Sequence, residues 1–134
     1  MIPFRVTFQQ GISICEQVVY AAKKAVISGQ MCKGEPFPSV RALSRALKIN
    51  PNTAHKVIGQ LVAEGLIEVQ PGLGTVVAER SSSSAIERSN LLKTEVEELV
   101  VEAKKLGLEL DEVTEAIADH WYRLEGTPRP ARRR

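Results

Sequence analysis

The 134-residue sequence has few aromatic residues, few cysteines and no long apolar run. Aromatic residues make up only 4% of the sequence, which argues against a protein that binds single-stranded nucleic acid by stacking bases on aromatic side chains. No run of about 18 apolar residues exists, and the first ten residues lack the basic and then apolar pattern of a secretion signal. Cys15 and Cys32 have neither metal-ligand spacing nor the density of a disulfide scaffold. These absences predict a cytoplasmic protein that does not enter the membrane.

What the sequence does have is a strong segregation of charge beneath a net charge of only +2. Residues 1–80 carry nine Lys/Arg against five Asp/Glu, whereas residues 81–125 carry five against eleven, and residues 126–134 add four arginines. Different parts of the chain therefore suit different partners, and the basic first part is the candidate for a polyanion such as nucleic acid.

Local signals divide residues 1–80 into three helices and a hairpin. Ser13 and Glu16 have the spacing of a capping box that opens a helix ending at Ser28-Gly29. Ser39 predicts the start of a second helix, and Asn50-Pro51 the start of a third that stops at Gly65. The apolar residues expected to face the core are Ile14, Val18, Ala22 and Val26, then Val40, Leu43 and Leu47, then Val57, Ile58 and Leu61.

Only a few residues separate the second and third helices, which is the connection length of a helix-turn-helix. Two β-prone runs, residues 66–69 and 75–78, then flank a turn at residues 71–74 and predict a hairpin. The order of these elements describes a winged helix-turn-helix. The predicted fold class is mainly α with one small β-hairpin.

The serine-rich stretch at residues 80–84, where the charge balance reverses, predicts a domain junction. Residues 81–125 then form two amphipathic helices, too short to bury their apolar faces alone, so we expect a second copy to cover them in a homodimer. Residues 126–134 are expected to form a basic flexible tail. The residues predicted to form the dimer seam are Leu92, Val96, Leu99, Ala103 and Leu106 at coiled-coil spacing, with Val113, Ile117 and Trp121 on the second helix.

The motifs over residues 13–78 resemble the DNA-binding domain of GntR-type bacterial transcription regulators. The resemblance rests on five motifs in one order: residues 27–34, Pro38-Ser39-Val40-Arg41, Asn50-Pro51-Asn52-Thr53, Glu64-Gly65-Leu66-Ile67 and Gly72-Leu73-Gly74-Thr75. The short C-terminal part is similar to the YtrA-type subfamily. The resemblance implies a homodimeric transcription regulator, usually a repressor, that binds double-stranded operator DNA.

Carried over by position, the family's DNA contacts fall on Arg41, Asn50, Asn52, Thr53, His55, Lys56 and Gly72. Physical reasoning favours Asn52, Thr53 and Lys56, which lie in the first turns of a helix suited to the major groove. Arg45, one turn after Arg41, can add a phosphate contact, although a solvated helix face also explains both arginines. Capping alone explains Asn50, and His55 is either a base reader or an exposed polar residue. Leu73 stands where that family commonly has lysine, so one phosphate contact from the wing is expected to be missing.

Other functions have little support in the residues. We expect that the protein is not an enzyme, because the sequence has neither a pattern of nucleophile and base nor a phosphate-binding glycine loop. We also expect that it binds no cofactor. Asp111, Glu115 and Asp119, spaced four apart, could hold a metal, but an exposed acidic stripe is usually only solvated, so no metal site is predicted. The alternative function is a winged-helix adaptor that binds protein rather than DNA. Any small-molecule effector is expected at the dimer interface or between the two domains.

Overall fold

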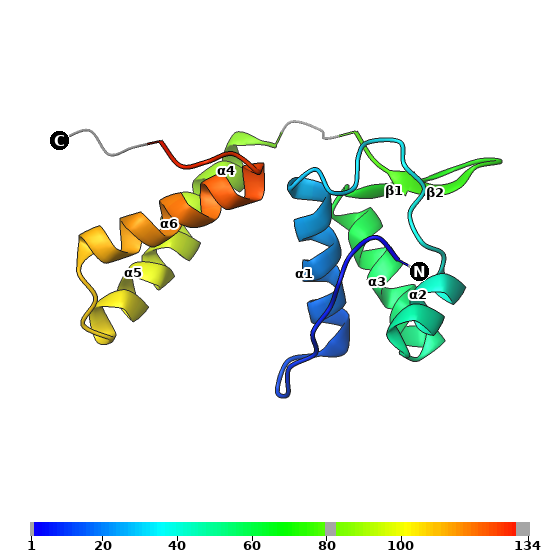
Figure 1. Cartoon of the computed structure of the whole chain (residues 1–134), viewed down its shortest axis with the longest axis horizontal. Helices are drawn as coiled ribbons and strands as arrows, with labels where there is room; N and C mark the ends of the chain where they lie inside the picture. Colours follow the sequence, from blue (N-terminus) through cyan, green and yellow to red (C-terminus); the bar gives the residue numbers. More distant parts are fainter. Residues whose placement is uncertain (1, 80–82, 131–134) are drawn as a thin grey trace. The chain divides into compact units, whose positions relative to one another are not determined.

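The computed structural model describes residues 2–79 and 83–130, and it divides the chain into two compact units, residues 1–80 and 81–134. Unit 1 contains three helices and a two-stranded hairpin, and unit 2 is helical (Figure 1). The architecture is therefore mainly α with one small hairpin, as the sequence predicts. No helix among the described residues is long and apolar enough to cross a membrane.

The helices of unit 1 are α1 (Ile14–Ile27), α2 (Val40–Leu47) and α3 (Pro51–Ala63). Each begins at the predicted cap: Ser13 Oγ accepts from the Glu16 N–H, Ser39 Oγ from the Ala42 N–H at 3.1 Å, and Asn50 Oδ1 from the Asn52 N–H at 2.8 Å. Such caps satisfy N–H groups that have no partner inside the helix, and they depend only on local sequence. This is why they could be predicted.

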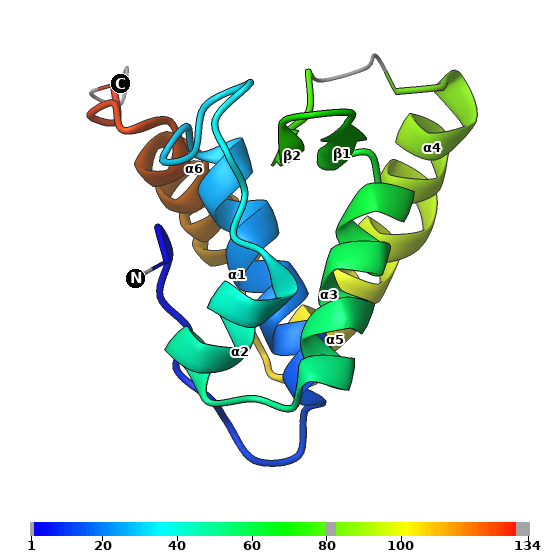
Figure 2. The ribbon, with the colours of Figure 1, turned by 90° about the vertical axis from the view of Figure 1, so that its right-hand side faces the viewer.

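α3 packs against both α1 and α2 (Figure 2). Its buried side chains, Ala54, Val57 and Leu61, lie on one face, while the predicted core residue Ile58 is only partly buried. On α1 the predicted apolar stripe was partly wrong. Val18 and Ala22 are buried, but Ile14 is 47% exposed at the start of the helix, and Val19 and Ala25 complete the buried face.

An ion pair joins Lys23 on α1 to Glu64, the C-cap residue of α3. Lys23 Nζ donates to Glu64 Oε1 at 2.8 Å, and this contact lowers the pKa of the Glu64 carboxyl. Both side chains are partly exposed, so the pair stabilises the fold by less than about 1 kcal/mol.

The hairpin consists of β1 (Ile67–Gln70) and β2 (Gly74–Val77), which pair antiparallel with Ile67 opposite Val77 and Gln70 opposite Gly74. The loop before α2 follows the outer edge of β2: the Gly34 N–H donates to the Val77 oxygen at 2.9 Å, and the Phe37 N–H to the Thr75 oxygen at 2.8 Å. These bonds satisfy backbone groups of β2 that the hairpin leaves unpaired. They also join the base of the hairpin, which is the wing of the winged helix-turn-helix, to the loop that leads into α2.

The first residues of the chain, for which sequence analysis predicted no role, close one side of the core. Phe4 is 5% exposed and stacks on Phe37 with ring centroids 6.1 Å apart. Gln30 donates to the Pro3 oxygen at 2.9 Å, and Gln17 donates to the Gln9 oxygen and accepts from the Gln9 N–H. Residues 2–10 thus form an N-terminal strap that is fastened to α1 and to the loop after it.

Unit 2 is built from α4 (Ala85–Asn90), the π-helical segment η1 (Leu91–Glu95), α5 (Val96–Lys105) and α6 (Leu110–Glu125). A full capping box of Ser84 and Glu87 starts α4. The helical structure of unit 2 therefore begins several residues before Leu92, the first residue of the predicted seam. At its other end α6 is capped by Gly126, which has a φ of 72°. This positive φ favours glycine and ends the helix.

Unit 2 of a single chain buries almost nothing. Among the described residues 83–130, Ala103 alone is buried. Several of the predicted seam residues are well exposed, for example Leu92 at 67%, Leu106 at 70% and Trp121 at 63%. Two such helices have no core of their own, so their apolar faces need a further covering surface.

Candidate nucleic-acid interface

The outward face of α3 carries four of the eight residues predicted to contact DNA. Asn52, His55 and Lys56 are exposed, and Thr53 is partly exposed. They lie in the first two turns of the helix, opposite the buried stripe of Ala54, Val57 and Leu61. The burial of one face fixes α3 in the unit, and the other face is left to present donors, acceptors and one cation to a ligand.

Helix α2 contributes two exposed arginines to the candidate interface. Arg41 and Arg45 are exposed and one turn apart, with Arg41 in the first turn of α2. The capping hydrogen bond from Ser39 and the buried side chain of Leu43 fix the position of this helix. Arg41 can therefore extend to a phosphate or a base edge from a fixed backbone, and Arg45 can add a second cation.

The turn between α2 and α3 is held by a residue that sequence analysis did not single out. Ser44 Oγ donates to the Ile49 oxygen at 2.7 Å, and the Ile49 N–H donates to the Ser44 oxygen at 3.1 Å. Lys48 takes a left-handed conformation with a φ of 55°, and Ile49 is buried. This turn sets the angle between α2 and α3. The short connection between these two helices was the one feature of the sequence that predicted the turn.

Asn50 has its side-chain oxygen committed to the cap of α3, as the capping interpretation predicted. Its amide NH2 group carries the remaining donors, so any DNA contact of Asn50 has to use that group. The residue therefore positions the N-terminus of α3, where the free N–H groups and the helix dipole favour a phosphate.

The tip of the wing is a turn at residues 70–73. The Leu73 N–H donates to the Gln70 oxygen at 3.1 Å, and Gly72 has a φ of 81°, with Pro71 before it. Proline followed by a residue of positive φ is the pattern of a type II turn. Gly72 is exposed and meets no other atom at its missing side chain, so its backbone is open to close approach.

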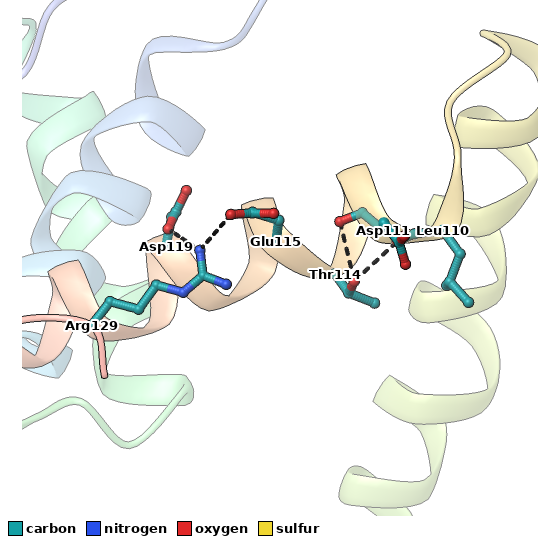
Figure 3. Close-up of polar contacts among 6 residues, drawn as sticks. All are labelled: Leu110, Asp111, Thr114, Glu115, Asp119 and Arg129. Atoms are coloured by element: carbon teal, nitrogen blue, oxygen red, sulfur yellow. Dashed lines mark hydrogen bonds and ion pairs between the residues drawn. The ribbon is translucent and has the colours of Figure 1, made fainter. Parts of the chain in front are cut away.

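The acidic stripe of α6 has a partner that sequence analysis missed. Arg129 Nη1 donates to Asp119 Oδ1 at 2.7 Å and to Glu115 Oε1 at 3.1 Å (Figure 3). The Asp119 carboxylate, with help from Glu115, raises the pKa of the Arg129 guanidinium. Within the described ranges no cluster of three metal-ligating side chains occurs. Arg129 belongs to the predicted flexible tail, whose residues 131–134 lie outside the described residues.

Comparisons with known proteins decide between the competing functions. Residues 15–77 match the family of bacterial regulatory proteins called the gntR family. The chain is also 33% identical over 107 residues to the HTH-type transcriptional repressor YtrA of Bacillus subtilis (strain 168), an alignment that covers 79% of this chain and 82% of the relative. This chain belongs to the GntR family.

Two solved structures share the fold of this chain over most of its length. A transcriptional antiterminator from Listeria monocytogenes EGD-e superposes with a TM-score of 0.80 at 23% identity and covers 96% of this chain and 97% of its own. A transcriptional regulator from Oenococcus oeni reaches a TM-score of 0.60 at 26% identity, covering 86% of this chain and 96% of its own. Membership of the GntR family makes this protein a DNA-binding transcription regulator of the helix-turn-helix class and not an enzyme.

Proposed function

We propose that this GntR regulator is a cytoplasmic repressor that binds a palindromic operator as a homodimer. The observation that carries the proposal is the exposed polar face of α3, supported by the repressor named among its relatives. In this proposal α3 enters the major groove, where Asn52 and Thr53 read bases, and Lys56 holds a phosphate. The remaining proposed DNA contacts are Arg41, Arg45, Asn50, His55 and Gly72.

The binding site can be obtained without knowing the regulated genes. Selection of a random library of about 30 base pairs on the 134-residue protein should enrich an inverted repeat with half-sites about one helical turn apart. Enrichment of no sequence would contradict sequence-specific binding. An enriched site without two-fold symmetry would contradict the homodimeric arrangement alone.

Base readers and phosphate contacts can then be separated. Asn52→Ala and Arg41→Ala should weaken binding to the selected site far more than binding to random duplex, because base contacts specify sequence and phosphate contacts do not. Lys56→Ala should weaken both and reduce the salt slope by about one per half-site. Gln60→Ala, at an exposed position near the other end of α3, is the control and should change neither. Equal losses on both duplexes for Arg41→Ala would remove it from the base-reading set.

The apolar faces of unit 2 support the homodimer. Val96, Leu99 and Ala103 share one face of α5, the C-cap residue Leu106 continues that face, and Val101 lies on the opposite face. Leu99→Asp would place an unpaired charge in the proposed seam, which costs several kcal/mol. Analytical ultracentrifugation should show a dimer for the wild type and for Val101→Asp, and a monomer for Leu99→Asp. A wild-type monomer at tens of micromolar would contradict the proposal.

Any small-molecule effector is proposed to bind where two copies meet. Because Ala103 alone is buried among residues 83–130, the described part of unit 2 in a single chain does not enclose the few hundred Å³ that such a ligand typically needs. A metabolite screen by isothermal titration tests this with the wild type and the Leu99→Asp monomer. Ligand binding that survives in the monomer with unchanged affinity would contradict a shared site.

A further inference from the structure

The N-terminal strap leaves its backbone groups without partners. Side-chain hydrogen bonds fasten it at Pro3 and at Gln9. Between these fastenings, residues 4–8 make no backbone hydrogen bond to any part of the chain that the structure describes. A row of unpaired N–H and C=O groups is what the edge strand of a sheet presents, and such an edge can pair with an added strand.

The strap also has the length of an extended chain. It connects Gln30, just beyond α1, with Gln17, near the start of α1, so it runs antiparallel to this helix (Figure 1). The part of α1 that follows Gln17 is about 15 Å long. The residues from Pro3 to Gln9 reach about 20 Å when they are extended, but only about 9 Å as a helix.

The side chains of the strap alternate between the core and the solvent. Phe4 is buried and Val6 is partly buried against the core, whereas Arg5 and Thr7 are exposed. This period of two is that of a strand, in which the backbone groups point sideways toward a neighbouring strand. The strap is therefore a strand-like segment without a neighbour.

A long groove lies between this segment and α1. Its volume is about 740 Å³, and its walls are residues between Phe4 and Ile12 on one side and residues between Glu16 and Ser28 on the other. That part of α1 is about 18 Å long, which leaves a mean cross-section of about 40 Å². An extended chain fits this cross-section, whereas a helix with its side chains is about 10 Å across and does not.

The groove carries cations at one end and apolar side chains beside them. Arg5 and Lys24 are exposed, and neither forms an ion pair within the described ranges. Tyr20, one turn before Lys24 on α1, is 64% exposed, and Ile12 is 48% exposed. The exposed carboxylate of Glu16 is about 12 Å along the helix from Lys24, so the two ends of the groove differ in charge.

We propose that this groove binds an extended segment of another protein, which pairs with residues 4–8 as an added strand. Backbone hydrogen bonds supply affinity in this mode, and alternate side chains supply specificity. The segment would place an acidic side chain at Arg5 and Lys24 and apolar side chains over Tyr20 and Ile12. The strap of a second copy fits less well, since it would bring another arginine to the cationic end. The reading face of α3 takes no part in the groove, so this inference does not depend on DNA binding.

Phage display of random decapeptides on the 134-residue protein tests the proposal. It should enrich sequences with alternating apolar residues and an acidic residue at one end. Arg5→Glu and Tyr20→Ala should each weaken binding of the enriched peptide by roughly tenfold in fluorescence anisotropy. Lys93→Glu, which reverses an exposed charge in η1, is the control and should bind as the wild type does. Failure to enrich such sequences, or unchanged binding in both groove variants, would overturn the proposal.

Two further measurements test the backbone pairing itself. N-methylation of alternate residues along the pairing edge of the peptide keeps its side chains but removes donors, so it should weaken binding tenfold or more. The amide hydrogens of residues 5–8 have no partner in the free protein, and some of them should become protected from exchange when the peptide is added. An N-methylated peptide that binds equally well, or strap amides that stay unprotected in the complex, would contradict strand addition.

Discussion

At the scale of single residues, the turn of the helix-turn-helix carries an unusual backbone conformation. Lys48 has a φ of 55°, and it is the one non-glycine residue of positive φ among residues 2–79 and 83–130. A side chain in this region costs about 1–2 kcal/mol, partly offset by the entropy that glycine loses on folding. Lys48→Gly should therefore stabilise the protein by about 0.5–1 kcal/mol in urea unfolding. Lys48→Ala removes the same side chain without relieving the backbone, and a gain of the same size there would contradict the explanation.

A second residue-scale prediction concerns the exposed thiol of Cys32. Hydrogen bonding to Glu35 and the negative charge of that carboxylate raise the pKa of the Cys32 thiol. A raised pKa means less thiolate at a given pH, so alkylation by iodoacetamide should need a higher pH than for an ordinary cysteine. In a Cys15→Ser background, Glu35→Gln should shift the rate profile to lower pH and Glu68→Gln should not. Identical profiles for all three proteins would exclude Glu35 as the cause.

Sequence alone predicted those residues whose role is local and missed those whose role depends on distant contacts. The caps at Ser39 and Asn50 were predictable because side chain and backbone partner are two or three residues apart. Phe4 finds its partner in Phe37, and Arg129 finds its partners on α6, so no short window contains both sides of either contact. The exposure of Asn52, His55 and Lys56 was predictable because burial of the other side of α3 follows from helical periodicity, and their role in reading DNA stays a prediction.

At the scale of elements, α3 contains a glycine that its helical structure does not require. Gly59 is exposed, its φ is not positive, and nothing lies within 4 Å of where a Cβ would be. Gly59→Ala should raise stability by about 1 kcal/mol through helix propensity alone, as measured by thermal unfolding. Gly65→Ala provides the contrast, because Gly65 has a φ of 74° and alanine there is strained. A loss of stability in Gly59→Ala would mean that α3 has a packing requirement at this position.

The C-terminal helices show why an element can be predicted more easily than its exact path. The heptad spacing predicted an apolar seam, which stays a prediction, but the π-helical segment η1 was not predicted. There the Val96 N–H donates to the Leu91 oxygen, one residue further back than in an α-helix. This extra residue changes the rotation between α4 and α5, and apolar spacing alone does not reveal it.

At the scale of the whole molecule, two half-site contacts joined in one dimer should dominate affinity. Unit 1 has its own buried core, so residues 1–80 should fold alone and bind DNA as a monomer. Under the proposed function, the full chain should prefer the inverted repeat over a single half-site by about 100-fold or more, because the second contact is intramolecular. Residues 1–80 alone should lose this preference while keeping affinity for one half-site. Fluorescence anisotropy on both duplexes measures it, and equal preference in the two proteins would contradict linked binding.

The N-terminal strap has a consequence for local unfolding. Its side chain Phe4 is buried, yet residues 2–10 belong to no helix or strand. A segment fastened by a few side-chain hydrogen bonds opens far more often than the helices it covers. Amide hydrogens of the strap should exchange with solvent quickly while those of α1 stay protected. Each opening would expose the ring of Phe37 to water, while the backbone hydrogen bonds from Gly34 and Phe37 to β2 would still hold the loop that leads into α2.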